Sequence, residues 1–176
     1  MTKRAFGKFP RRKLDQYDTP ETAVYPLFPH LPKVDFNVWE PCAGACSLAF
    51  ALSSYPHCDI ITVTDVEPRH SAVVQMNALD ATMLPRGSSL IITNPPWERG
   101  ILHKMIEHFR KMVPTWLLID ANWMHTKQAS EHLEYCAKIV AIGRVSWMEN
   151  DRGGFDDSCW YLFESDRTKT TFHGRN

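Results

Sequence analysis

The chain has 176 residues, of which 44% are hydrophobic and 23% charged, a balance typical of a globular protein with a core of its own and not of a disordered, collagen-like or disulfide-stapled chain. The 20 Lys and Arg residues cancel the 20 Asp and Glu residues, so net charge gives no argument for a polyanionic partner. No apolar run approaches the roughly 20 residues of a membrane span, so we expect no membrane partner. The five cysteines form no C-x-x-C pair, so we expect free thiols and a cytoplasmic location.

One domain is predicted over residues 17–165. Residues 1–16 are basic and irregular, which predicts a flexible arm and a candidate contact for nucleic acid. Residues 166–176 are predicted to be a C-terminal tail. The first helix is expected to begin near Tyr17, with Thr19 as its cap and Pro20 at the first helical position, and to end before Pro29.

Strands and helices alternate along the rest of the chain. Apolar and β-branched runs predict strands over residues 36–39, 60–64, 90–93, 116–119 and 138–142, with 60–64 as a buried strand. Helical periodicity predicts helices over residues 45–54, 101–112 and 130–135, and residues 71–76 fit helix and strand equally. Residues 145–147 and 160–163 are expected to form an antiparallel hairpin at the sheet edge. The pattern predicts an α/β fold with a mostly parallel, doubly wound sheet.

Ligands of such sheets bind beyond the carboxyl ends of the strands, so the residues that follow each strand are the candidate site. After the first strand comes the turn from Glu40 to Gly44, whose glycine lets a ligand approach the backbone. Asp65 directly ends the second strand and suits a ribose diol better than Glu67. Both features serve a dinucleotide or S-adenosylmethionine equally well, although the turn lacks the G-x-G-x-x-G spacing of nicotinamide enzymes.

The residues that end the 90–93 strand are Asn94-Pro95-Pro96-Trp97. Pro96 has no N–H, so the Pro95 carbonyl is free to act as an acceptor beside the Asn94 side-chain oxygen. Two acceptors suit an exocyclic NH₂ group that carries two hydrogens, and Trp97 offers a flat surface on which a base can stack. The motif therefore predicts chemistry on a planar amine or amide.

Three motifs, Asp18-Thr19-Pro20-Glu21, Glu40-Pro41-Cys42-Ala43-Gly44 and Asn94-Pro95-Pro96-Trp97, resemble those of the S-adenosylmethionine-dependent amino-group methyltransferases, most closely the small phage-type DNA adenine-N6 methyltransferases. The resemblance spans Tyr17 to about Phe163. It implies a Rossmann-like class I methyltransferase fold, S-adenosyl-L-methionine as methyl donor, and catalysis by Asn94, Pro95, Pro96 and Trp97. The implied cofactor-binding residues are Tyr17, Thr19, Pro20, Glu40, Pro41, Cys42, Gly44, Asp65, Val66, Asn77 and Asn94.

Two positions depart from the family pattern. Cys46 stands where the family has the second glycine of its Gly-x-Gly loop, and Asn77 stands where an acid is commoner. Cys42 and Cys46 are interpreted as packing residues with some reactivity, because a helix N-terminus lowers the pKa of a thiol. No metal site is predicted, since His103 and His108 lie five residues apart and miss the i, i+4 spacing of a metal-binding pair.

The hypothesis is direct in-line methyl transfer to the N6 atom of an adenine flipped out of DNA. The same motif fits an RNA or a protein glutamine as substrate, and a non-catalytic protein that binds the cofactor or nucleic acid is a further alternative. Trp123 and Trp147 are candidates for the base pocket or for the core. The protein is expected to be a monomer or a homodimer.

Overall fold

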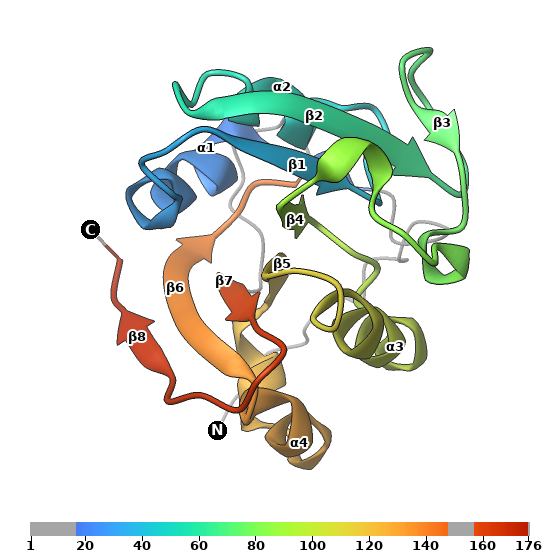
Figure 1. The fold of residues 1–176 in the computed structure, drawn as a ribbon. Coiled ribbons are helices and arrows are strands. Elements are labelled where there is room, and N and C mark those ends of the chain that lie inside the picture. The colour runs from blue at the N-terminus through green and yellow to red at the C-terminus, as the bar shows by residue number, and fades with distance from the viewer. Residues whose placement is uncertain (1–16, 148–156, 176) are drawn as a thin grey trace, which may run out of the picture.

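The structure is a computed structural model, and it describes residues 17–147 and 157–175 (Figure 1). The predicted basic arm, residues 1–16, and residues 148–156 lie outside the described residues. No helix of the described ranges is long and apolar enough to span a membrane.

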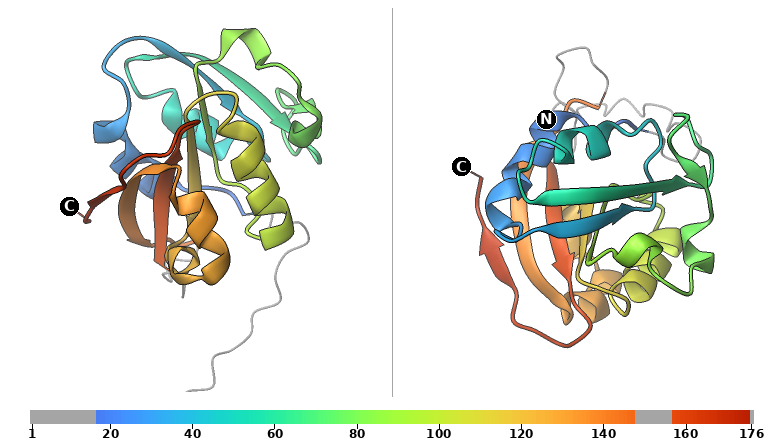
Figure 2. Two further views of the ribbon diagram at one scale, coloured as in Figure 1. Left: turned by 60° about the horizontal axis from the view of Figure 1, so that its bottom comes forward. Right: turned by 45° about the horizontal axis from the view of Figure 1, so that its top comes forward.

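The architecture is a mostly parallel sheet with helices on both faces (Figures 1 and 2). The sheet has the order β3-β2-β1-β4-β5-β7-β6-β8, and β7 alone runs antiparallel to both of its neighbours. The strands are β1 Phe36–Glu40, β2 Cys58–Asp65, β3 Val74–Gln75, β4 Leu90–Thr93, β5 Thr115–Asp120, β6 Cys136–Arg144, β7 Asp157–Phe163 and β8 Thr171–His173. The α-helices are α1 Glu21–Val24, α2 Ser47–Leu52, α3 Arg99–Phe109 and α4 Ser130–Leu133. Shorter 3-10 helices are η2 Tyr25–His30, η3 Ala78–Asp80, η4 Pro85–Gly87, η5 Ala121–His125 and η6 Lys127–Ala129.

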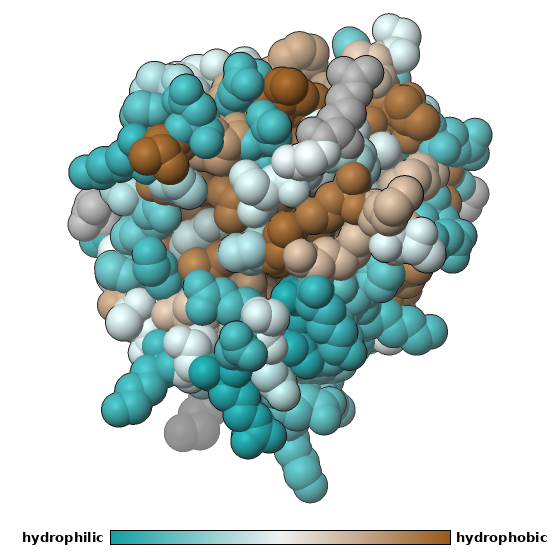
Figure 3. Space-filling view, in the orientation of Figure 1, coloured by the Kyte–Doolittle hydropathy of each residue, from teal (hydrophilic) through white to brown (hydrophobic). Residues whose placement is uncertain are grey.

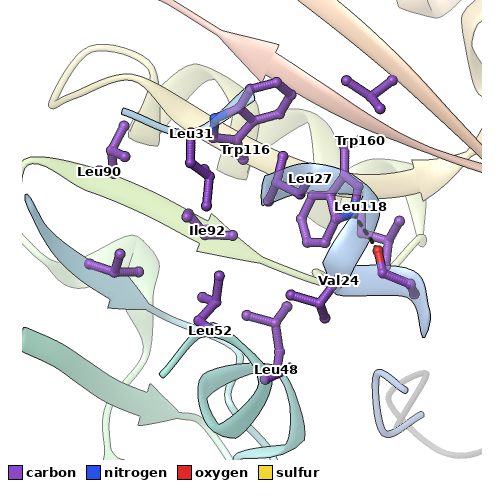
Figure 4. Packing of buried hydrophobic residues seen from close by; sticks show 14 of the residues in the cluster. Val24, Leu27, Leu31, Leu48, Leu52, Leu90, Ile92, Trp116, Leu118 and Trp160 are labelled. Carbon is purple, nitrogen blue, oxygen red and sulfur yellow. Dashed lines mark hydrogen bonds between the residues drawn. The ribbon is translucent and has the colours of Figure 1, made fainter. Parts of the chain in front are cut away.

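A hydrophobic cluster fills each face of the sheet. The first cluster packs α1, η2 and α2 against the sheet, with Leu27, Leu52 and Ile92 near its centre (Figure 4). In it the Trp160 indole N–H donates to the Ala23 carbonyl at 2.7 Å, which joins α1 to β7. The second cluster packs α3, η5 and α4 against the other face. Strands that are apolar on both sides therefore lie between two helical layers, as the sequence predicts.

The first helix differs from its prediction. It begins at Glu21, Pro20 precedes the first turn, and no side chain caps it. After Val24 the chain tightens into the 3-10 helix η2 with Pro26 in its first turn. The physical reason is that Pro26 has no N–H and would break an α-helix interior, whereas the first turn of a helix leaves its N–H groups unpaired in any case.

The expectation of a buried strand over residues 60–64 is wrong. Strand β2 does form, but most of its residues are partly or fully exposed to solvent, and Ile60 is 39% exposed. The reason is its position next to the sheet edge, where its outer neighbour β3 pairs with it at two residues only. Residues 71–76, ambiguous in the sequence, contain this short strand.

The antiparallel hairpin is also different from the one expected. It is formed by β6 and β7, with Val140 opposite Trp160, and residues 145–147 lie outside any strand. Strand β7 is inserted between β5 and β6 because nearly all its side chains are buried, as a central strand requires. The edge is instead β8, within the segment expected to be a tail, which pairs with β6 and is held by a hydrogen bond of 2.7 Å from the Thr170 hydroxyl to the Cys136 carbonyl.

Candidate active site

A cavity of about 350 Å³ lies at the carboxyl ends of β1, β2 and β4, where the sequence predicts the site. Ten of the eleven predicted cofactor-binding residues line it, and Pro20 does not. Of the predicted catalytic residues, Asn94 and Pro96 line the cavity, whereas Pro95 is buried and Trp97 lies beside it. The lining members of the predicted cofactor set are Tyr17, Thr19, Glu40, Pro41, Cys42, Gly44, Asp65, Val66, Asn77 and Asn94.

The turn after β1 is built on two residues with positive φ. Gly44 has φ 50°, and its N–H donates to the Asp65 carboxylate at 2.8 Å. Cys46, which stands where the family has a second glycine, also adopts the left-handed conformation, with φ 69°. This conformation costs a residue with a side chain roughly 1–2 kcal/mol, so the backbone of the turn keeps the glycine geometry although the residue is cysteine.

Asp65 is oriented by backbone groups at the end of β2. One carboxylate oxygen accepts from the Gly44 N–H and the other accepts from the Glu67 N–H at 2.7 Å. Each oxygen keeps a further lone pair for a ligand hydroxyl. Glu67 also lines the cavity, and its side chain is exposed.

Glu40 carries a buried carboxyl group in the cavity wall. The residue is 2% exposed, and its Oε2 atom has no hydrogen-bond partner among the described residues. Burial raises the pKa of Glu40 to about 8, a hydrogen bond from the backbone of Ala49 opposes the rise, and the nearby Asp65 charge adds to it. Such a group gains a partner when a cationic ligand atom approaches it.

Asn94 lies half-buried at the end of β4, and its side chain is held by the N-terminal segment. The amide Nδ2 of Asn94 donates to the Thr19 hydroxyl at 3.1 Å, across 75 residues of sequence. Thr19 is therefore a partner of Asn94 and not the helix cap that the sequence suggests. Because Nδ2 is bound, the amide presents its Oδ1 as an acceptor.

Three aromatic side chains, Trp97, Trp147 and Tyr17, form a cluster. The Trp97 indole N–H donates to the Leu118 carbonyl at 3.0 Å, which fixes the ring against the sheet. Trp147 packs edge-on against Trp97, with ring centroids 5.6 Å apart, and lies 6.3 Å from the ring of Tyr17. Trp123 is a core residue, since it is 4% exposed within the second cluster.

Asn77 caps the short helix η3. Its Oδ1 accepts from the Leu79 N–H at 3.2 Å, and its Nδ2 donates to Asp80 at 3.1 Å. The side chain is exposed at the cavity edge, and its predicted role in cofactor binding stays a prediction.

Several lining residues have no signal in the local sequence. The most polar is Arg69, whose guanidinium pairs with Asp18 at 2.6 and 3.2 Å across the rim. The helical spacing of Ile101 and Met105 does show that they share one face of α3, although not that this face reaches the cavity. Further apolar lining comes from Met76, Ala78 and Leu79.

The structure corrects the expected thiol reactivity. Burial raises the pKa of Cys42 to about 12, despite a hydrogen bond with Thr93, and burial also raises the pKa of Cys46. Both thiols stay protonated at neutral pH and are packing residues. Within residues 17–147 and 157–175, no three His, Cys, Asp or Glu side chains form a group able to hold a metal ion.

No protein-family model and no curated protein matches the chain. Known structures do resemble it. A candidate RNA methyltransferase from Pyrococcus horikoshii has a TM-score of 0.67 at 12% identity, over 90% of this chain and 91% of the other. The methyltransferase subunit of a type I restriction-modification system from Streptococcus thermophilus also reaches 0.67, at 11% identity, over 96% of this chain and 49% of the other.

A candidate class I S-adenosylmethionine-dependent methyltransferase from Listeria monocytogenes has a TM-score of 0.58 at 9% identity, over 89% of this chain and 65% of the other. The chain therefore spans about half the length of the restriction-modification subunit and nearly all of the archaeal protein. At these identities the likeness concerns the fold. The prediction of an α/β, Rossmann-like class I methyltransferase fold is confirmed.

Proposed function

We propose that this chain transfers a methyl group from S-adenosyl-L-methionine to the exocyclic N6 of adenine in DNA. The observation that carries the proposal is the side chain of Asn94, which lines the cavity at the end of β4 with its amide nitrogen bound to Thr19. An amide oxygen directed in this way, followed by two prolines and a tryptophan, matches the acceptor that an amino group requires.

The cavity fits this methyl donor by its charge. The donor carries a sulfonium, an ammonium and a carboxylate, so its net charge is positive. Besides the buried Glu40, the described lining residues include three acids, Asp18, Asp65 and Glu67, and one base, Arg69. A dinucleotide would instead bring a doubly negative pyrophosphate into the same acidic wall, which Coulomb repulsion disfavours.

Individual groups suit parts of the donor. Asp65, oriented by two backbone N–H groups, can accept from a ribose diol. The unpartnered Oε2 atom of buried Glu40 suits the ammonium group, whose positive charge would favour the ionised form of this carboxyl group. Met76, Ala78 and Leu79 offer an apolar wall for the adenine ring.

The proposed mechanism is mainly positioning and polarisation. When bound, S-adenosylmethionine supplies an activated methyl group for direct in-line transfer to a nucleophilic nitrogen. Asn94 Oδ1 and the Pro95 carbonyl accept the two N6 hydrogens, which turns the nitrogen lone pair toward the incoming methyl group. As the new N–C bond forms, the bond between the methyl group and sulfur breaks and S-adenosylhomocysteine is left. N6 then loses one proton to water. Fixed acceptors of this kind lower the barrier without reorganising in the transition state.

DNA is favoured as the substrate by the motif and by the aromatic group beside it. Extrusion of a base costs a few kcal/mol, and stacking on Trp97, with Trp147 and Tyr17 close by, compensates for part of this cost. RNA is the second candidate, because the archaeal structure that matches nearly end to end is described as an RNA methyltransferase. The basic arm, residues 1–16, is proposed to contact the nucleic acid, and the chain to act as a monomer or a homodimer.

The test is transfer of labelled methyl to unmethylated DNA, followed by mass spectrometry of the nucleosides. We expect N6-methyladenine from the wild type and a loss of about 100- to 1,000-fold for Asn94→Ala, the usual cost of one oriented hydrogen-bonding group. Asn122→Ala is the matched control, because Asn122 is exposed after the neighbouring strand β5 and lines no part of the cavity. Label in RNA or in protein glutamine would move the substrate assignment, and near-normal turnover of Asn94→Ala would refute the mechanism.

A further inference from the structure

Arg69 is the single basic side chain among the described residues that line the cavity. The acids on the same walls, Asp18, Asp65 and Glu67, outnumber it even without the buried Glu40. The cavity therefore attracts a ligand with net positive charge, and it repels a carboxylate group everywhere except next to Arg69. The charge distribution thus leaves one counter-charge for an anionic group.

The guanidinium of Arg69 is held at the cavity rim by contacts from two separate segments. Its Nη2 and Nη1 donate to the two oxygens of Asp18 at 2.6 and 3.2 Å, across 51 residues of sequence. The backbone N–H of Arg69 donates to the Gly44 carbonyl at 3.0 Å. Asp18 and Gly44 therefore fix both ends of the residue.

Gly44 lets the guanidinium of Arg69 lie close to the turn after β1 without being displaced. A Cβ atom at position 44 would lie 2.8 Å from Nη2 of Arg69, closer than such atoms approach one another in proteins. The positive φ of Gly44, 50°, is a second reason for glycine. The missing side chain thus makes room for the guanidinium as well as for a ligand, and it brings the positive charge directly onto the turn after β1.

We propose that Arg69 is a specificity residue that binds the carboxylate at the amino-acid end of the methyl donor, an assignment that rests on the proposed function. Asp18 takes two of the five N–H donors of the guanidinium, and the others remain for a second acceptor. The planar guanidinium matches a carboxylate in shape and charge. Asp18 acts as a positioning residue, because it keeps Arg69 at the rim.

This assignment gives the two ends of the ligand zwitterion separate partners. Glu40 has an unpartnered carboxyl oxygen for the ammonium, and Arg69 has the positive charge for the carboxylate. The site would then distinguish donors with a complete amino-acid end from adenosine derivatives that lack the carboxylate.

The test compares two ligands by calorimetry with the full chain. One is S-adenosylhomocysteine, and the other is its decarboxylated analogue, which keeps the adenosine, the thioether and the ammonium. We expect Arg69→Gln to weaken S-adenosylhomocysteine by about 10- to 100-fold, the usual effect of losing a charged hydrogen-bond pair, and to change the analogue by less than about 2-fold. Arg69→Lys, which keeps the charge but loses the planar fork, should give an intermediate loss for S-adenosylhomocysteine only.

Arg167→Gln is the matched control, because Arg167 pairs with Glu134 at 3.0 Å and lines no part of this cavity. It should leave both affinities unchanged. Equal losses of both ligands in Arg69→Gln would mean that the residue only shapes the rim, and no loss of either would remove it from the site; both results overturn the assignment. A wild type that binds neither ligand would instead refute the proposed methyltransferase function.

Discussion

Replacing Glu40 by glutamine is expected to stabilise the protein at about pH 8 and to leave its stability at about pH 5 nearly unchanged. Glu40 is buried, and its Oε2 atom has no hydrogen-bond partner among the described residues. Burial raises its pKa from 4.5 to about 8, so the folded protein holds this carboxyl group in its neutral form at neutral pH. Glutamine has the same size and is neutral at every pH.

The magnitude follows from the difference between the folded and unfolded pKa of Glu40. Between 4.5 and about 8 the folded state binds a proton that the unfolded state has released, so the free energy of unfolding falls as pH rises. Each unit of pH costs about 1.4 kcal/mol in the middle of this window, which amounts to roughly 3–4 kcal/mol between pH 5 and pH 8. The free energy of unfolding of the Glu40→Gln variant does not fall in this way, since glutamine has no carboxyl group that titrates.

The assay is urea unfolding of wild type and Glu40→Gln at both pH values. The difference in free energy of unfolding should grow in favour of the variant by a few kcal/mol from pH 5 to pH 8. Glu67→Gln is the control, because the exposed Glu67 lines the same cavity and should show no such growth. If the curves for wild type and Glu40→Gln run parallel across this range, the carboxyl group of Glu40 is ionised in the folded protein and the reasoning is refuted.

Two further predictions concern the support of Asn94 and the buried thiols. Thr19→Val removes the hydroxyl that accepts a hydrogen bond from Asn94 Nδ2 at 3.1 Å. We expect kcat for methyl transfer to fall about 10-fold, while the affinity for S-adenosylhomocysteine changes by less than about 3-fold. An unchanged kcat would show that Asn94 does not need this hydrogen bond. Iodoacetamide at about pH 8 should label all five cysteines slowly in the native protein and rapidly in the urea-unfolded protein. The reason is that burial raises the pKa of each thiol, so that little of the reactive thiolate is present in the folded state. Rapid labelling of Cys42 in the native protein would contradict its burial.

Local patterns in the sequence were enough to predict strands β1, β2, β4, β5, β6 and β7 and the edge of the sheet at which the site lies. The run Leu90–Thr93 is apolar on both faces and is stopped by Asn94 and two prolines, so both the strand and the amide after it follow from a few neighbouring residues. The same holds for Asp65 at the end of β2. Short-range signals of this kind depend on side-chain periodicity and on the backbone limits of proline and glycine, which are properties of the residues themselves.

The order of the strands and the partners of the site residues were decided by the tertiary structure. Strand β7 fits between β5 and β6 because both its faces can be buried there, and β8 then pairs with the free edge of β6, which no local pattern indicates. Thr19 resembles a helix cap in the sequence, yet its hydroxyl binds Asn94, 75 residues away. Arg69 carries no local signal at all, since its role depends on Asp18, 51 residues away, and on the missing side chain of Gly44. Contacts between distant residues, and the burial that shifts the pKa of Glu40, arise only when the sheet and its helices are packed together, so the residue types alone do not specify them.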